Sequence, residues 1–158
     1  MPKLREALAE AGLEDVQTYL QSGNVVATSR AKPEAVARKV ARVISERFGL
    51  DVAVVARTRD ELDEVVRRNP LRAVAKEPKR YQVSFLSAEL DPAVVHKLEA
   101  AAEPDERVEV IGREVYAWHP RTIARSRLWA QLAGQGLGVT ATSRNWTTVE
   151  ALLALAGE

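Results

Sequence analysis

RYQVSFL, residues 80–86, alternates apolar and polar side chains and predicts a strand with one buried face. Residues 91–102 follow with a helical pattern, and Pro92 suits the first turn of that helix. Residues 106–111 and 114–118 flank a Gly-Arg pair and predict a β-hairpin. Short strands that alternate with helices in this way favour an α+β sandwich over a doubly wound parallel sheet.

The residues on either side of this stretch predict more elements of the same kind. DVAVVA, residues 51–56, is nearly continuously apolar and predicts a short strand buried on both faces. Thr58 and Glu61 have the spacing of a capping box and predict the start of a helix that ends near residue 68. The remaining predictions are a hairpin over 16–29 and helices over 1–11, 33–48, 126–133 and 145–156.

The order of elements predicts an α+β fold made of two related ferredoxin-like α/β sandwich lobes, with mixed or antiparallel sheets. Residues 71–79 lie between two prolines and lack a convincing period, so they are the best candidate for a linker. We therefore predict an N-terminal lobe over 1–70 and a C-terminal lobe over 80–158.

Composition excludes several classes of function. The 158 residues contain no cysteine and two histidines, which excludes disulfides, thiolate catalysis and a metal site built from cysteine or several histidines. Phosphate-loop, dinucleotide, serine-hydrolase and zinc-protease motifs are all absent, so the sequence implies no cofactor. It also lacks an apolar run of membrane-spanning length and a signal peptide, from which we expect a cytoplasmic protein without a membrane partner.

The charge distribution changes sign near Val115. Residues 103–114 carry five acids against two arginines, whereas residues 115–149 carry no acid, four arginines and all three tryptophans. The net charge of the whole chain is only +1, so a small anionic ligand ranks above nucleic acid as a partner for this basic stretch.

Two predicted helix starts within residues 115–149 combine capping residues with arginine. A cation at a helix N-terminus opposes the helix dipole, whereas the free N–H groups and the guanidinium both favour a bound anion. The alternative is that these arginines pair with the acidic residues 103–114 or reach solvent. The anion-site candidates are Arg125, Ser126, Arg127, Thr142, Ser143, Arg144, Asn145 and Trp146. Trp146 could instead pack in the core.

Four polar residues are secondary candidates for a site. Gln21, Ser22 and Asn24 lie in a turn between apolar strands, where the needs of the turn explain most of the pattern. His119 stands at the charge boundary and could act as an acid or base, although a capping or surface role suits it better.

Four segments carry a resemblance to a known family: TYLQSGNVV (18–26), VIGREVYAWHP (110–120), ARSRL (124–128) and GVTATSRNWTTV (138–149). In these segments the chain resembles the bacterial domain of unknown function family 1697. The resemblance implies a bacterial α+β protein with two related ferredoxin-like lobes, and it implies no particular activity.

The resemblance departs from the family at the start of the chain. Members of the family usually open with a hydrophobic strand and a glycine-containing turn, whereas this sequence begins directly with the following helix. We therefore expect an exposed edge in the first sheet, which a homodimer contact could cover.

These observations favour a non-catalytic module that binds a small anionic or phosphorylated ligand at the arginine-rich C-terminal face. One alternative is an enzyme of unknown reaction with a cleft around Gln21, Ser22 and His119. Another is a homodimeric protein-interaction domain.

Overall fold

The computed structural model describes residues 2–19, 23–121, 123–134 and 136–157. The N-terminal half consists of α1 (Pro2–Glu10), β1 (Glu14–Tyr19), β2 (Asn24–Thr28) and α2 (Pro33–Phe48). An extended segment then leads to α3 (Arg59–Arg68). The C-terminal half consists of η1 (Pro78–Arg80), β3 (Tyr81–Leu86), α4 (Pro92–Ala101), β4 (Arg107–Ile111), β5 (Glu114–Trp118), η2 (Ile123–Arg125), α5 (Arg127–Ala133), β6 (Ala141–Asn145) and α6 (Trp146–Ala156).

The strands form two antiparallel sheets, which confirms the α+β prediction. β1 pairs with β2, and the second sheet has the order β4-β5-β3-β6. The series β3-α4-β4-β5-α5-β6 has the element order of a ferredoxin-like unit. The ferredoxin-like description of both lobes stays a prediction, because the described part of the N-terminal half contains only a two-stranded sheet.

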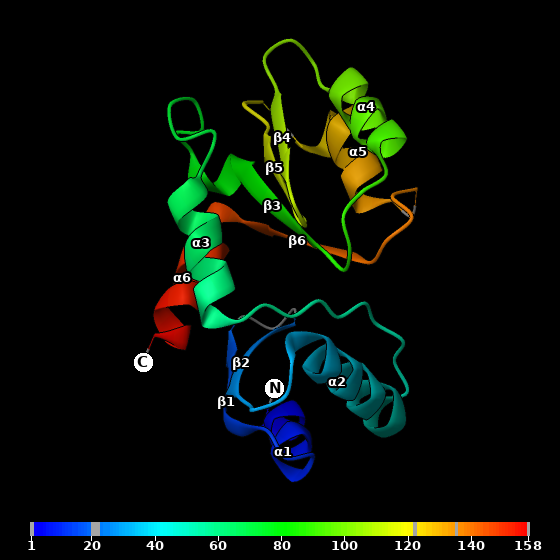
Figure 1. Ribbon diagram of the computed structural model, residues 1–158, viewed down its shortest axis with the longest axis vertical. Helices are drawn as coiled ribbons and strands as arrows, with labels where there is room; N and C mark the ends of the chain where they lie inside the picture. The colour runs from blue at the N-terminus through cyan, green and yellow to red at the C-terminus, as the bar shows by residue number, and fades with distance from the viewer. Residues whose placement is uncertain (1, 20–22, 122, 135, 158) are drawn as a thin grey trace.

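Helices cover both faces of the four-stranded sheet, with α3 and α6 on one face and α4 and α5 on the other (Figure 1). Successive strand residues point to opposite faces. Val83 and Tyr116 therefore pack with α3 and α6, whereas Val115 and Ala117 pack with α4 and α5. A third apolar cluster joins α1, α2 and the β1–β2 hairpin in the N-terminal half.

The strand predicted over 51–56 is wrong. Residues 49–58 are in neither a helix nor a sheet, and Val52 is 40% exposed where burial on both faces was expected. An apolar pattern can predict a strand, but the strand forms only where a neighbour completes its backbone hydrogen bonds. No described strand pairs with this segment.

The capping box predicted at the start of α3 is confirmed, because Thr58 and Glu61 exchange the expected side-chain-to-backbone hydrogen bonds. α3 packs on the C-terminal sheet, where Val65 joins the apolar cluster around Tyr81. Leu71, in the segment predicted to be a linker, is buried in the same cluster. The division into 1–70, 71–79 and 80–158 stays a prediction.

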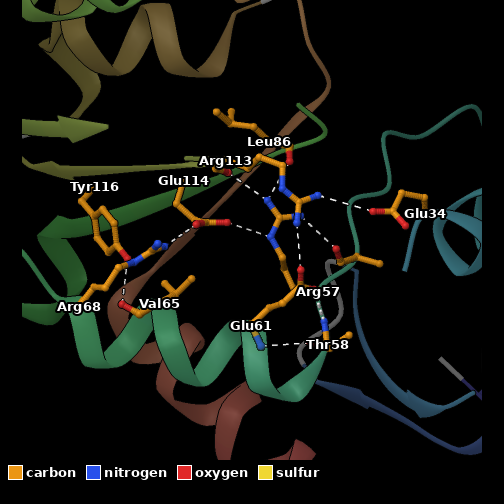
Figure 2. A network of polar contacts seen from close by, with 11 residues as sticks. Glu34, Arg57, Thr58, Glu61, Val65, Arg68, Leu86, Arg113, Glu114 and Tyr116 are labelled. Carbon is orange, nitrogen blue, oxygen red and sulfur yellow. Dashed lines mark hydrogen bonds and ion pairs between the residues drawn. The ribbon is translucent and has the colours of Figure 1, made fainter. Parts of the chain in front are cut away.

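A buried ion-pair network fixes α3 and the preceding segment to the sheet (Figure 2). Glu114, the first residue of β5, accepts hydrogen bonds from Arg57 Nε at 2.9 Å and from Arg68 Nη2 at 2.5 Å. The Arg57 and Glu114 side chains are only 7% and 8% exposed. Arg57 Nη2 also donates to the carbonyls of Leu86 (2.8 Å) and Arg113 (3.0 Å). One arginine therefore holds the extended segment against the end of the sheet.

Glu114→Gln should lower the free energy of unfolding by about 3–5 kcal/mol, because the buried guanidinium of Arg57 and the partly buried one of Arg68 then lose the carboxylate that neutralises them. Urea unfolding monitored by tryptophan fluorescence measures this loss. The matched control is Glu109→Gln on the exposed side of β4, which should change stability by about 0.5 kcal/mol or less. Equal losses in the two variants would show that the network does not stabilise the fold.

Candidate functional site

Arg144 lies in β6, opposite Val83 of β3. The helix start predicted at Thr142–Asn145 is confirmed only at its last residue, since pairing with β3 keeps Thr142–Arg144 in β6. Asn145 alone caps the helix, and its Oδ1 accepts from the N–H of Thr148 at 2.9 Å. Directly opposite residues of an antiparallel pair share a face, so the Arg144 side chain lies on the face that carries α3 and α6.

The guanidinium of Arg144 reaches the turn between β1 and β2. Its Nε donates to Asn24 Oδ1 at 2.6 Å, and its Nη2 donates to the Gly23 carbonyl at 3.3 Å. Asn24 is buried and is held in turn by its own donation to the Tyr19 carbonyl at 3.0 Å. Two segments that are far apart in the sequence, the polar turn and the strand that carries Arg144, therefore meet at one guanidinium.

Arg144 differs electrostatically from the other partly buried arginines. Burial lowers its pKa from the ordinary value, and no carboxylate of the described residues lies within ion-pair distance of it. A guanidinium has five N–H donors. Its bonds with described residues, to Asn24, Gly23 and the Ser143 carbonyl, leave one N–H on Nη1 and one on Nη2 for another acceptor.

A second polar cluster surrounds His119, whose side chain is only 1% exposed. Glu106 Oε2 accepts from Ser126 Oγ at 2.6 Å and lies 2.6 Å from His119 Nδ1. Ser126 Oγ also caps α5 by accepting from the Trp129 N–H at 3.0 Å. Burial alone would raise the pKa of Glu106, but the hydrogen bonds from the Glu103 N–H, Ser126 and His119 outweigh burial and lower it.

This cluster does not have the geometry of a serine-histidine-acid triad. In such a triad the serine hydroxyl and the acid bind opposite nitrogens of the imidazole ring. Here Ser126 and His119 bind the same carboxylate oxygen, and Ser126 Oγ lies 3.4 Å from the nitrogen that faces Glu106. His119 Nε2 is buried and has no hydrogen-bond partner among the described residues. The cluster therefore fixes the start of α5 against the sheet.

Sequence reasoning missed Glu106 as the partner of His119, although the hairpin contained the signal. A two-residue turn at Gly112-Arg113 fixes the register in which Arg107 pairs with Trp118. The residues one step further out, Glu106 and His119, must then face each other.

The predicted site residues do not all lie close together in the structure. Asn24, Ser143, Arg144 and Asn145 gather around β6 and the β1–β2 turn, whereas His119 and Ser126 pack with α5 across the sheet. Arg127 is exposed and approaches Glu103 at 3.4 Å, as the acidic-partner alternative expected. Arg125 borders a cavity of about 420 Å³ next to Ser126.

The remaining candidates have structural roles or lie outside the described residues. Trp146 is buried and stacks on Tyr81 with 4.9 Å between ring centroids, so it belongs to the core. Gln21 and Ser22 lie outside the described residues. Within the described residues, no group of three or more acidic or histidine side chains could hold a metal ion, and no helix is long and apolar enough to cross a membrane.

Residues 1–116 match the family described as "Protein of unknown function (DUF1697)". The chain belongs to this family. Among solved structures, this DUF1697 member is similar to the conserved bacterial protein SP0830 from Streptococcus pneumoniae. The TM-score is 0.77 at 19% identity, over 99% of this chain and 88% of the other, so the likeness concerns the fold. No curated protein matches the sequence.

Glu106→Gln should destabilise the DUF1697 chain at neutral pH by an amount that shrinks in acid. The pKa of Glu106 is lower in the folded state than the ordinary 4.5, so its ionised form stabilises the fold above that value. The contribution is lost as pH falls through the lowered pKa. Urea unfolding over this range measures the gap between variant and parent. A gap that does not change with pH would contradict the role given to the carboxylate, and Glu109→Gln is the exposed control.

Proposed function

We propose that this protein is a non-catalytic module that binds a small anionic or phosphorylated ligand at Arg144. One observation carries the proposal: Arg144 is a partly buried guanidinium with two free N–H groups and no carboxylate partner among the described residues. Desolvating a charge costs free energy unless an opposite charge compensates it. A phosphate or carboxylate at Arg144 would supply that charge and accept both N–H groups.

The elements around Arg144 support a bound anion in two further ways. Asn24 and the Gly23 carbonyl hold the guanidinium in one orientation, which lowers the entropy that a ligand must remove on binding. α6 begins two residues after Arg144, and the N-terminus of a helix favours negative charge. Of the two predicted parts of the anion site, the proposal therefore keeps the one around Arg144 in β6.

The other functions rank below this one. The proposed enzyme needs His119 beside the polar turn, whereas His119 is bound to Glu106 near α5. Nucleic-acid binding would draw on exposed arginines, of which Arg121 and Arg127 approach acidic residues. A homodimer and a cytoplasmic location remain separate proposals that do not depend on Arg144.

Inorganic phosphate should raise the melting temperature of the protein, and Arg144→Ala should abolish the rise. At a phosphate concentration about 100 times Kd, the folded state gains about 2.7 kcal/mol, which corresponds to a rise of roughly 5–10 °C for a chain of this size. Differential scanning fluorimetry measures the shift against chloride at matched ionic strength.

Two further variants sharpen this test. Arg144→Gln can still donate toward Asn24 but carries no charge, so it should also lose the shift. Arg127→Ala removes an exposed arginine that approaches Glu103 and should keep the full shift. An equal phosphate effect in the parent and Arg144→Ala, or none in the parent across phosphate, sulfate and carboxylates, would refute the proposal.

A further inference from the structure

The outer edge of β6 pairs with no described strand. The sheet order β4-β5-β3-β6 leaves β6 with one hydrogen-bonded neighbour, β3. A strand at the edge of a sheet presents backbone N–H and C=O groups to whatever lies beside it. What this edge can bind therefore depends on which of its residues direct those groups outward.

The pairing with β3 fixes which residues of β6 face outward. The Ser87 N–H donates to the Thr140 carbonyl at 2.8 Å, so these opposite residues form a hydrogen-bonded pair. In an antiparallel ladder such pairs recur at every second residue, and the residues between them point their backbone groups away from the neighbour. Ala141 and Ser143 are the residues between. Their N–H and C=O groups therefore face the open side of β6.

Only one of these outward groups has a described partner. The Ser143 carbonyl accepts from Nη1 of Arg144 at 2.8 Å. The N–H groups of Ala141 and Ser143 and the Ala141 carbonyl make no hydrogen bond with any described residue. These free backbone groups belong to every second residue of β6, which is the spacing that an added strand requires.

These groups open into a groove. A cavity of about 830 Å³ is bordered by Ala141 and Ser143 on one side, by Trp129 and Leu132 of α5 on another, and by Ala53 of the extended segment. Figure 1 shows that segment passing beside β6 on its way from α2 to α3. The described residues that border the cavity carry no charged side chain. The groove therefore suits an uncharged ligand that can satisfy backbone hydrogen bonds.

The segment between α2 and α3 borders the cavity through Ala53. Residues 51–56 pair with no described strand. A chain bound in the cavity would therefore hydrogen-bond to β6 along one edge of its backbone, with Ala53 and α5 bordering it.

We propose that this groove binds an extended, uncharged peptide segment of a partner protein, which adds to β6 as a further strand. The peptide backbone supplies the partners for the outward groups of Ala141 and Ser143, and small or β-branched side chains fit the uncharged walls. The two sites adjoin at the Ser143 carbonyl, which already accepts from Arg144. The peptide site is distinguished by the three main-chain groups that Arg144 does not use, the N–H groups of Ala141 and Ser143 and the Ala141 carbonyl.

The first test titrates the protein into short, fluorescein-labelled, acetylated and amidated peptides that alternate valine with threonine or serine, and follows fluorescence anisotropy. We expect saturable binding and slowed hydrogen exchange at the amides of Ala141 and Ser143. Two further peptides carry N-methyl groups at the odd or at the even positions. Only one of the two should bind, because only one set of N–H groups faces β6. Equal binding of both forms, or no binding of any peptide, would overturn the proposal.

The second test removes one outward donor from the protein. Ala141→Pro deletes an N–H that the ladder with β3 does not use, and proline is tolerated at the first residue of an edge strand. Ala141→Val has a side chain of similar size and keeps the N–H. We expect about tenfold weaker peptide binding for the proline variant than for the valine variant, as for a lost hydrogen bond.

Control measurements separate this proposal from the others. Added phosphate should leave peptide binding unchanged, so loss of the phosphate response in Arg144→Ala bears only on the anion site. Equal affinity of the Ala141→Pro and Ala141→Val variants would overturn strand addition. A concentration-dependent dimer by light scattering that Ala141→Pro abolishes would replace the peptide with a second copy of the chain and would also overturn it.

Discussion

The carboxylate of Glu114 is the constraint on which the arrangement of the two halves depends. It neutralises Arg57, from the segment that joins the halves, and Arg68, from α3. The remaining donors of Arg57 bind main-chain carbonyls at the end of the β3–β5 ladder. Removing ionic groups from water costs free energy, and this cost offsets much of the attraction within the network. The main effect of the network is therefore to fix the position of the segments that it joins. It defines where the joining segment crosses the sheet, and hence which surfaces face the N-terminal half.

Arg57 and Arg144 illustrate how a partner decides the role of a buried cation. Both guanidinium groups link the N-terminal part of the chain to the C-terminal sheet, and both use carbonyl acceptors. Arg57 also has a carboxylate and the ring of Phe85, 5.7 Å from its centre, so its charge is compensated within the protein. Arg144 has the amide oxygen of Asn24 instead. An amide orients the guanidinium without neutralising it, which leaves the charge available to a ligand.

The sequence predicted the elements whose signals are local. α2 has a strong apolar period, α3 has a capping box, and β3 alternates apolar and polar residues, so each formed where expected. The single buried face predicted for β3 is wrong, because helices cover both faces of the sheet (Figure 1) and all six residues of β3 are buried. The strand predicted over residues 51–56 is wrong because an apolar pattern contains no information about whether a neighbouring strand is present. The start of the last helix was predicted no more closely than Thr142–Asn145, because threonine, serine and asparagine all suit a helix cap. Pairing with β3 takes Thr142–Arg144 into the strand and leaves Asn145 as the cap. The register of the hairpin could have predicted the contact between Glu106 and His119. No local pattern could have predicted the contact between Arg144 and Asn24.

The same alternation that pairs β6 with β3 determines what its other edge can do. An open edge invites self-association, and proteins limit this with charged side chains or by covering the edge. Arg144 turns back onto the Ser143 carbonyl and places a charge at the end of the edge, while α5 and the joining segment enclose the rest. A charge at the end of the edge and segments that border it oppose the approach of a second sheet. Because Arg57 and Glu114 hold one of those walls, the shape of the groove depends on the ion pair that also fixes α3 to the sheet.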